Sequence, residues 1–235
     1  MSVDAGDKRA DRIASMFDAI APRYDLLNHL LSGGIDRRWR TRAIDSLGLT
    51  GREVLLDVCT GTVDVALQAT GARRVLGVDF AAAMLRVGQQ KVRGAAQAGR
   101  IALTRADATR LPVGSEVVDA VTVAFGIRNV EQPERACEEM ARVLRRGGRL
   151  AILEFGVPRV PGVRQIYLWY FTYVLPWVGR ALSGHRVAYS YLPASVGSFP
   201  PPREFAAMLG RAGFADIQAV PLTFGIVYLY TAVRA

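Results

Sequence analysis

Acidic side chains follow three successive apolar segments in the first half of the chain. Asp57, Asp79 and Asp107 come at or just after the ends of the segments 54–58, 75–78 and 101–104. The carboxylate of Asp57 repels a phosphate and attracts an ammonium or a sulfonium group. A carboxylate at Asp79 suits the two hydroxyls of a ribose, and Asp107 suits the amino group of an adenine. Together the three residues predict a ligand site.

A single glycine, Gly61, marks the tight turn between Asp57 and the next helical segment, Val63–Thr70. A dinucleotide site needs three glycines here, so that the backbone can approach a pyrophosphate at the helix N-terminus. One glycine suits the approach of a smaller ligand. Two structural alternatives stay open: the turn only joins a strand to a helix, and Asp79 only caps the helix that follows it.

Strands and helices alternate between residues 51 and 160, which places these carboxylates at one edge of a sheet. This order predicts a doubly wound α/β fold with a mostly parallel sheet, whose ligands bind at the carboxyl ends of the strands. The strands are expected at Glu53–Val58, Arg74–Val78, Ile101–Thr104, Val118–Ala124 and Arg149–Phe155, and the helices at Val63–Thr70, Ala81–Arg93 and Gln132–Leu144, the last one ended by Gly147 and Gly148.

The segments on both sides of this core predict further layers of the same domain. Residues 1–50 carry Ile13, Phe17 and Ile20 on one helix face and predict a helical cover. Residues 161–200 predict an aromatic-rich helical insert, with a helix over 163–182. Residues 201–235 add a helix at 203–212 and a closing pair of strands at 217–220 and 225–233. We therefore expect one domain over residues 1–235 with a seven-stranded sheet.

The composition narrows the class of protein. The net charge is +9, from 30 Lys and Arg against 21 Asp and Glu, which suits nucleic acid, an anionic membrane surface or an acidic substrate. Two cysteines, Cys59 and Cys137, and two histidines are too few for a disulfide framework or a metal site. The charged N-terminus is unlike a secretory signal, and the apolar run 166–178 is too short to span a bilayer. We expect a cytoplasmic protein without a metal.

Longer motifs extend beyond the three carboxylates and cover nearly the whole chain. The most specific is Phe125-Gly-Ile-Arg-Asn-Val130, and the others are Met16–Asn28, Leu31–Arg40, Leu153–Phe155 and Ala188–Val196. With the carboxylates, they resemble the ubiquinone/menaquinone biosynthesis C-methyltransferase family, a group of class I S-adenosylmethionine-dependent methyltransferases.

The resemblance implies S-adenosylmethionine as the cofactor and a site that contains Gly61, Thr62, Asp79, Asp107 and Ala108. It implies C-methylation of a prenylated quinol, either demethylmenaquinol, as in demethylmenaquinone methyltransferases, or the related ubiquinone precursor. The sequence does not choose between a naphthoquinone and a benzoquinone ring.

Three residues depart from the family pattern. Val63 stands where many members have Gly or Ala, and we expect it to crowd the methionine end of the cofactor. Ala124 replaces a common Ser and removes one hydrogen-bonding group. Tyr230 replaces a common His. These departures bear on affinity and substrate detail rather than on the type of reaction.

A carbon of a neutral quinone ring is a poor nucleophile. Reduction to the quinol and loss of a phenolic proton raise the electron density on that carbon, so methylation needs both. We expect Arg128 to stabilise the resulting oxyanion or to position a water that takes the proton, since arginine is not a base at ordinary pH. Asn129 is expected to orient this network. The alternative is that Arg128 forms only a structural ion pair with Glu154 or Asp107.

Two other segments have both a functional and a structural interpretation. Tyr24 and Asp25 can close over the acceptor, whereas the charged stretch 36–40 is expected to be a solvated helix face with Trp39 docked on the core. The insert carries five aromatic residues between positions 167 and 173. These aromatics suit contact with an isoprenoid tail, contact with a membrane surface, or plain core packing.

Two other functions compete with quinol methylation. An RNA methyltransferase agrees with the net charge, but base stacking needs aromatics interleaved with cations, and residues 165–178 contain no Lys or Arg. A catalytically silent subunit that binds quinone or a partner enzyme is the other alternative. We expect a prenylated quinol and no nucleic acid as ligand, and leave open a homodimer and contact with the inner face of the membrane.

Overall fold

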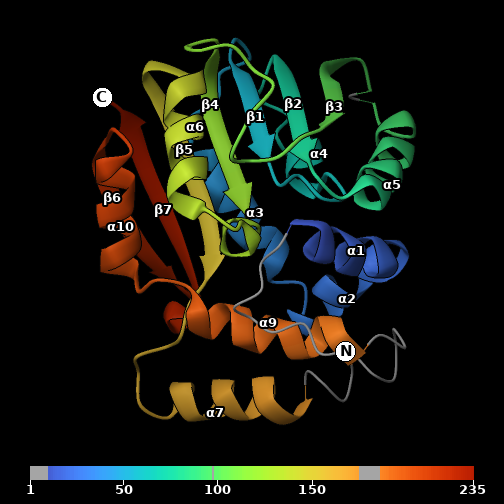
Figure 1. The fold of residues 1–235 in the computed structure, drawn as a ribbon, viewed down its shortest axis with the longest axis vertical. Coiled ribbons are helices and arrows are strands. Elements are labelled where there is room, and N and C mark those ends of the chain that lie inside the picture. Colours follow the sequence, from blue (N-terminus) through green and yellow to red (C-terminus); the bar gives the residue numbers. More distant parts are fainter. Residues whose placement is uncertain (1–9, 97, 175–185) are drawn as a thin grey trace.

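Seven strands form one sheet in the order β3-β2-β1-β4-β5-β7-β6 (Figure 1). The computed structural model describes residues 10–96, 98–174 and 186–235. The strands are β1 (Val54–Val58), β2 (Arg74–Asp79), β3 (Ile101–Arg105), β4 (Val118–Ala124), β5 (Leu144–Phe155), β6 (Phe214–Leu222) and β7 (Val227–Arg234). The first five strands pair in parallel, and β7 runs antiparallel to β5 and β6. The predicted doubly wound, mostly parallel sheet is confirmed.

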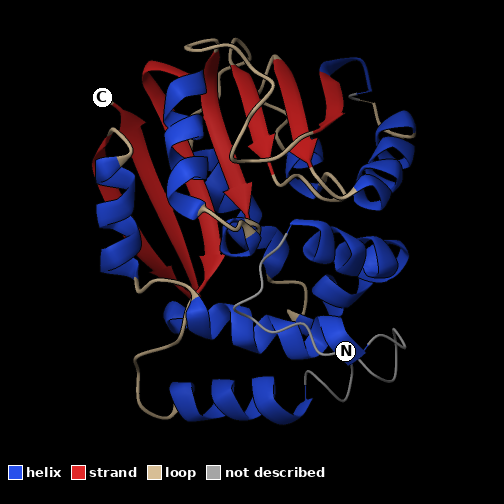
Figure 2. Ribbon diagram, in the orientation of Figure 1, coloured by secondary structure: helices blue, strands red, loops and turns tan. Residues whose placement is uncertain are grey.

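Helices cover both faces of this sheet, as the apolar character of its strands requires (Figure 2). Neighbouring strand residues point to opposite faces, so Leu56 packs with α6 and α10, whereas Leu55 packs with α3, α4 and α5. The helices are α1 (Ala10–Ile20), α2 (Tyr24–Leu31), α3 (Asp36–Ser46), α4 (Asp64–Gln68), α5 (Ala82–Arg93), α6 (Pro133–Val143), α7 (Val163–Trp169), α9 (Arg186–Ser198) and α10 (Pro202–Arg211).

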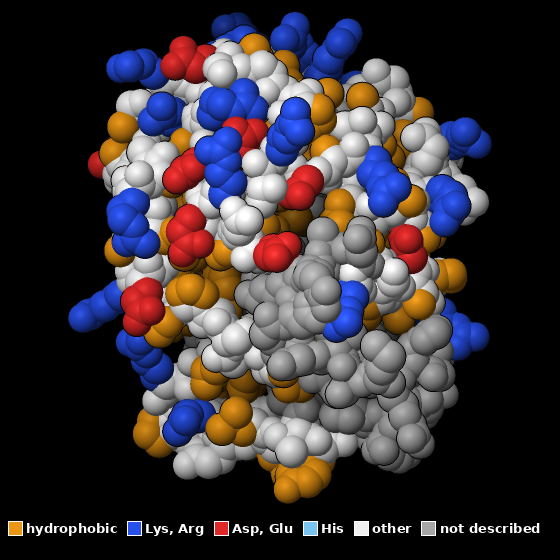
Figure 3. All heavy atoms as spheres, viewed as in Figure 1, with side chains coloured by type: hydrophobic (Ala, Val, Ile, Leu, Met, Phe, Trp, Pro, Cys, Tyr) orange, Lys and Arg blue, Asp and Glu red, His pale blue; other side chains and the backbone are white. Residues whose placement is uncertain are grey.

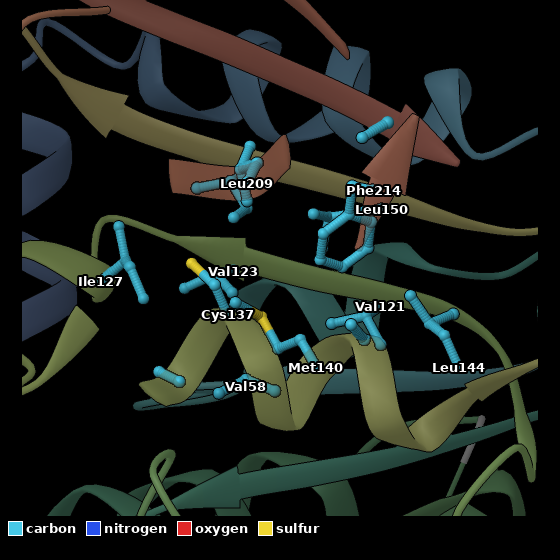
Figure 4. Packing of buried hydrophobic residues seen from close by; sticks show 14 of the residues in the cluster. Val58, Val121, Val123, Ile127, Cys137, Met140, Leu144, Leu150, Leu209 and Phe214 are labelled. Atoms are coloured by element: carbon cyan, nitrogen blue, oxygen red, sulfur yellow. The ribbon is translucent and has the colours of Figure 1, made fainter. Parts of the chain in front are cut away.

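One face of α6 shows how the core is built. Cys137 and Met140, three positions apart on the helix, point toward Val121 and Val123 of the central strand β4 (Figure 4). All four side chains are fully buried. Burial raises the pKa of the Cys137 thiol to about 12, so this cysteine is an inert core residue.

The cover and the insert lie beyond the carboxyl ends of the parallel strands (Figure 1). Ile13 and Ile20 of α1 form a buried cluster with Met84 of α5 and Tyr191 of α9, so segments far apart in sequence meet here. The insert continues from α7 into a π-helical turn, Tyr170–Val174. The rest of the expected helix, residues 175–182, lies outside the described residues. No helix in the described part of the chain is long and apolar enough to cross a membrane.

The helix expected at 132–144 is not ended by the two glycines that were expected to end it. Gly147 and Gly148 do not cap α6, because β5 already begins at Leu144. A side chain at Gly148 would lie 2.8 Å from the carbonyl oxygen of Arg145, and Gly147 has a φ of +74°. The two glycines therefore allow a tight irregularity in a long strand, which pairs with β4 on both sides of it.

Val63 adopts a left-handed conformation, with φ of 66°, at the start of α4. This conformation is unusual for a β-branched residue. Its fully buried side chain packs toward α5, where a Cβ added to Gly88 would lie only 2.7 Å from Val63 Cγ1. Val63 and Gly88 are therefore a matched large and small pair.

This pairing predicts non-additive effects on stability. Gly88→Ala should lower the free energy of unfolding by about 1–2 kcal/mol, because overpacking outweighs the gain in helix propensity. Val63→Ala in the same chain should recover most of that loss, because it removes the clashing methyl. Urea unfolding of both single variants and the double variant gives the coupling energy. Simple addition of the two single effects would contradict the pairing.

Candidate active site

A cleft of about 150 Å³ opens at the carboxyl ends of the parallel strands. Its wall includes Gly61 after β1, Asp79 at the end of β2, and Asp107 and Ala108 after β3. Asn129, after β4, belongs to the same wall. The parallel order of the strands brings these residues, up to 68 positions apart in the chain, to one edge of the sheet. Val78, Phe80 and Met84 make part of the surface apolar.

Asp79 is tied to the turn of Gly61. The Gly61 N–H donates to Asp79 Oδ2 at 2.8 Å, and the Ala81 N–H donates to Oδ1 at 2.9 Å. Burial raises the pKa of Asp79 despite these hydrogen bonds. The N-cap residue of α5 is Ala81, so the alternative that Asp79 only caps this helix is wrong. Its carboxylate shapes the turn and also faces the cleft.

Asp57 does not line the cleft, contrary to the expectation from its place at a strand end. It is 1% exposed, and its Oδ2 accepts a hydrogen bond from Thr60 Oγ1 at 2.5 Å. Burial raises its pKa to about 7, and the nearby charge of Asp79 adds to the rise. Asp57 therefore supports the turn before Gly61 from inside the core, through its hydrogen bond with Thr60, and its carboxyl group ionises near neutral pH.

The residues after Gly61 turn away from the cleft. Thr62 is 2% exposed and its hydroxyl donates to Asp25 of α2, so its side chain faces the cover. Val63 packs toward α5 and does not crowd the cleft, because its left-handed backbone points the side chain into the core. Ala124 does line the cleft. Tyr230 is buried beside Phe205, with ring centroids 4.8 Å apart. It lines neither the cleft nor the larger cavity described next.

A second cavity, of about 490 Å³, lies between the cover, the insert and the ends of β4 and β5. We call it the acceptor cavity. Much of its wall is aromatic, with Trp39, Phe155, Tyr167, Tyr170 and Tyr191 among its residues. Phe17, Tyr24 and Phe125 line both this cavity and the cleft. The two spaces therefore adjoin at three aromatic side chains.

Phe17 and Phe125 were missed as site residues by the sequence interpretation. Its place on one helix face with Ile13 and Ile20 predicts only packing for Phe17. Phe125 stands out in the sequence only as the first residue of the motif 125–130. Their aromatic type gives no signal of this position, because the wall forms only when the cover meets the sheet. Tyr24 was expected here, and burial raises the pKa of its hydroxyl.

The motif at 125–130 divides its side chains between the two spaces. Phe125 has a left-handed φ of 61°. At Gly126 an added Cβ would lie 2.3 Å from Cys59 Cβ, so only glycine fits this close approach. The 3-10 turn that follows, Ile127–Asn129, then places Arg128 on the wall of the acceptor cavity and Asn129 on the wall of the cleft.

Arg128 is a buried cation with a fixed partner. Its Nη1 donates to Glu154 Oε1 at 2.7 Å and to the carbonyl of Phe125, and its guanidinium carbon lies 5.3 Å from the centre of the Phe155 ring. The expected ion pair with Glu154 is therefore present, and one with Asp107 is not found among the described residues. Arg128 Nε is buried without a hydrogen-bond partner among those residues. Pairing with Glu154 thus leaves part of the guanidinium for another group.

Asn129 is also buried, and its Oδ1 has no partner within the described chain. A buried polar atom without a hydrogen bond costs about 1–3 kcal/mol. Such atoms are rare in folded proteins. Arg128 and Asn129 therefore each carry one unsatisfied polar atom, in residues that line the acceptor cavity and the cleft respectively.

The charged stretch 36–40 is not a wholly solvated face. Arg37 and Arg38 are exposed as expected, but Asp36 and Arg40 are buried and line the acceptor cavity. Trp39 is docked on the core as expected, and its Nε1 donates to Thr223 Oγ1 at 2.9 Å. The helix turns residues 36, 39 and 40 to the same side, which a count of charges does not reveal.

The aromatic insert also divides into two faces. Tyr167 and Tyr170 line the acceptor cavity, whereas Trp169 and Tyr173 are 58% and 66% exposed. Core packing therefore does not account for all of these aromatics. Trp177, which belongs to the same expected helix, lies outside the described residues.

The cover is attached to the core by charged side chains. Lys91 Nζ of α5 bonds to Asp25 Oδ2 of α2 at 2.8 Å and also to Asp64 of α4. Asp64 in turn lies 3.9 Å from His29 and 3.8 Å from Arg40. Through Asp25 the network reaches Thr62 beside the cleft. The position of the cover thus depends partly on contacts with the turn after β1 that carries Gly61 and Thr62.

Comparison with known proteins agrees with this arrangement. The model of the ubiE/COQ5 methyltransferase family matches residues 4–234. The chain belongs to this family. It is 44% identical over 231 residues to the ubiquinone/menaquinone biosynthesis C-methyltransferase UbiE of Geobacter sp. (strain M21), covering 97% of this chain and 98% of the relative. It is 41% identical over 230 residues to the demethylmenaquinone methyltransferase of Bacteroides fragilis, covering 97% and 94%.

The fold of this methyltransferase also occurs in distant solved structures. A SAM-dependent methyltransferase from Thermotoga maritima superposes with a TM-score of 0.66 at 16% identity, covering 95% of this chain and 100% of that one. At this identity the likeness concerns the fold alone. The family assignment therefore depends on the sequence match, and the chemistry on the two adjoining cavities.

The raised pKa of Asp57 predicts a pH-dependent stability. An aspartate in the unfolded chain ionises near pH 3.9, so between about pH 4 and pH 7 the folded methyltransferase holds the proton more tightly. The contribution of Asp57 to the free energy of unfolding should therefore fall as the pH rises through this window. Between pH 4.5 and pH 8, the change in the free energy of unfolding of Asp57→Asn should differ from that of the wild type by about 2–4 kcal/mol, measured by urea unfolding. Identical pH profiles would show that Asp57 ionises normally.

Proposed function

We propose that this methyltransferase transfers a methyl group from S-adenosylmethionine to a ring carbon of a prenylated quinol, demethylmenaquinol or the related ubiquinone precursor. The observation that carries the proposal is the junction of the cleft with a larger aromatic cavity at Phe17, Tyr24 and Phe125. Transfer to carbon needs donor and acceptor held close and aligned. The names of the relatives in Geobacter and Bacteroides support the same substrate class.

The cleft suits S-adenosylmethionine, whose sulfonium group supplies the methyl when it is bound. Asp79 would accept hydrogen bonds from the ribose hydroxyls, and Asp107 with Ala108 would hold the adenine. Gly61 leaves room for the backbone to come close. The carboxylates of Asp79 and Asp107 favour a positively charged ligand, and the unpartnered Oδ1 of Asn129 offers it a further acceptor. Thr62 would act indirectly, by fastening the cover through Asp25.

The acceptor cavity suits a hydroquinone ring. Its aromatic wall gives flat apolar contact, and Arg128 supplies a fixed positive charge beside the junction. Loss of a phenolic proton puts negative charge on the ring oxygen and raises electron density on the neighbouring carbon. Arg128, held by Glu154 at 2.7 Å through Nη1, would stabilise that oxygen through an N–H of the guanidinium that Glu154 does not engage. Because the guanidinium is already oriented, little reorganisation is needed when the charge forms.

The proposed function is tested directly with purified protein, S-adenosylmethionine and chemically reduced quinols under nitrogen. Demethylmenaquinol, the benzoquinol precursor of ubiquinone and bulk RNA are offered separately, and the products are analysed by mass spectrometry. We expect one methyl group added to a quinol ring carbon and none to RNA. Methylation of RNA alone would establish the competing function, and tight quinol binding without turnover would indicate a silent binding subunit.

We further propose that the exposed face of α7 contacts the membrane in which a prenylated substrate is dissolved. Ile166 and Trp169 of α7 are 68% and 58% exposed, and Arg164 of this helix is exposed too. Tyr173, in the π-helical turn that continues α7, is 66% exposed. Hydrophobic side chains lie along the lower edge of the molecule, where α7 is placed in Figure 1 (Figure 3). Tyr167 of α7 lines the acceptor cavity. One helix would thus join the lipid surface to the site, with arginine favouring anionic lipid.

Arg128 is expected to act on the rate rather than on cofactor binding. Arg128→Lys keeps a positive charge beside Glu154 but loses the planar fork. Single-turnover methylation should slow by about tenfold to a thousandfold, or about 1.4–4 kcal/mol of barrier. The affinity for S-adenosylmethionine and the melting temperature should change little. A lower melting temperature with a rate that falls only in proportion would favour a purely structural ion pair.

The α7 face predicts a loss of membrane binding without a loss of chemistry. The double variant Ile166→Ser, Trp169→Ser should bind liposomes containing phosphatidylglycerol severalfold more weakly, measured by co-sedimentation, because it removes interfacial apolar area. Its turnover of a water-soluble quinol without a long tail should be unchanged. Val117→Ser, which changes an exposed apolar residue at the opposite edge of the sheet, is the matched control. Equal binding by all three proteins would refute the contact.

A further inference from the structure

The wall of the acceptor cavity contains an ion pair that has no role in the proposed chemistry. Asp36 and Arg40 of α3 are 3% and 5% exposed, are bonded to each other, and both line the cavity. The guanidinium carbon of Arg40 lies 5.7 Å from the centre of the Phe125 ring, at the junction with the cleft. Phe125 in turn contacts Phe155, with ring centroids 4.6 Å apart and the ring planes tilted by 32°. The pair therefore belongs to the same part of the site as the reacting ring.

Asp36 keeps an acceptor position open. Its Oδ1 accepts from Ser32 Oγ at 2.8 Å, and its Oδ2 pairs with His29 Nδ1 at 2.8 Å and with Arg40 Nη1. A carboxylate offers about four lone-pair positions, so these bonds leave about one, on Oδ1, among the described contacts. Burial alone would raise the pKa of Asp36, but the hydrogen bonds from Ser32 and Arg40 hold it below its usual range. At neutral pH this residue is thus a pure acceptor.

Arg40 supplies the complementary donors. Asp36 engages its Nη1, and Asp64 lies 3.8 Å from the same nitrogen. A guanidinium carries five N–H groups in a fixed fork, so others remain for a ligand in the cavity. Arg128 and Arg40 line the acceptor cavity together with Tyr24, and both cations oppose the rise that burial causes in the pKa of the Tyr24 hydroxyl. Two arginines, one from the turn after β4 and one from the cover, therefore belong to the wall of the same cavity.

We propose that Asp36 and Arg40 bind the second hydroxyl of the hydroquinone ring, opposite the oxygen held by Arg128, and thereby select the reduced ring over the oxidised one. A quinol hydroxyl donates to Asp36 and accepts from Arg40. A quinone carbonyl can accept from Arg40 but has no proton for Asp36, whose buried lone pair would face another acceptor. Sites that hydrogen-bond a hydroxyl reject analogues without it strongly. This inference depends on the proposed function, because it concerns the same ring.

The two residues should then have different effects on binding. Asp36→Asn can donate to a carbonyl as well as accept from a hydroxyl, so it should remove the preference for the reduced ring. Arg40→Lys keeps a cation beside Asp36 but loses the fork, so it should weaken both ring forms to a similar extent and leave the preference. Asp45→Asn is the matched control, because Asp45 lies on the same helix as Asp36 but is exposed and does not line the acceptor cavity.

The test measures dissociation constants by calorimetry with S-adenosylhomocysteine bound, so that no methylation occurs. The probes are 1,4-naphthalenediol under reducing conditions and 1,4-naphthoquinone. The wild type and Asp45→Asn should prefer the diol by about tenfold to a hundredfold, the size expected for a hydrogen bond to a charged group. Asp36→Asn should bring this ratio within threefold. Melting temperature and S-adenosylhomocysteine affinity identify any variant that is misfolded, and Arg40→Lys still tests the site in that case.

The outcomes separate this inference from the proposed function. A preserved ratio in a folded Asp36→Asn protein, or an equal loss of preference in Asp45→Asn, overturns the assignment of Asp36. A change of ratio in Arg40→Lys as large as in Asp36→Asn overturns the division of roles. If the wild type binds and methylates quinols but shows no preference, only this inference fails. If it binds neither ring, the proposed function fails as well.

Discussion

Lys91 joins two carboxylates that belong to different layers of the molecule, Asp25 of the cover and Asp64 of the core. The acceptor cavity is bounded by both layers, so its shape depends on how this contact seats the cover. Partly buried ion pairs of this kind add little net stability, because desolvation offsets much of the attraction. They do fix geometry, since a displaced cover would leave charges unpaired. The same network reaches Thr62, so the turn of the cofactor cleft and the acceptor wall are positioned together.

The two adjoining spaces differ in the charged side chains of their walls. The cleft has Asp79 and Asp107 in its wall with Asp57 beneath, whereas the acceptor cavity has Arg128 and Arg40, each held by a carboxylate. Burial raises the pKa of Asp57 and Asp79, so an added positive charge in the cleft would favour their ionised forms. The cleft therefore favours a cationic ligand, whereas in the acceptor cavity Glu154 and Asp36 balance the charges of the two arginines.

The sequence was sufficient for the sheet and for the strand ends. Apolar runs separated by helical periods located all five parallel strands, and parallel order alone brought Asp79, Asp107 and Gly61 together. It was not sufficient where backbone conformation or distant contacts decide direction. The left-handed φ of Val63 turns its side chain into the core, which residue type does not indicate. The burial of Asp36 and Arg40 depends on contacts with α2, α4 and the Phe125 ring, so a charged helical segment looked solvated.

Backbone strain at the end of β4 explains why the motif 125–130 has its residue types. A bulky residue with positive φ costs about 1–3 kcal/mol and persists only where the surroundings enforce it. Phe125 pays this cost with φ of 61°, beside Cys59, which has a φ of 55°. Gly126 can pack against Cys59 because it has no Cβ. The strained turn holds the Phe125 ring at the junction and sends Arg128 and Asn129 to opposite sides. A relaxed turn would move all three groups at once, so the strained turn sets the shape of the wall where the cleft and the acceptor cavity meet.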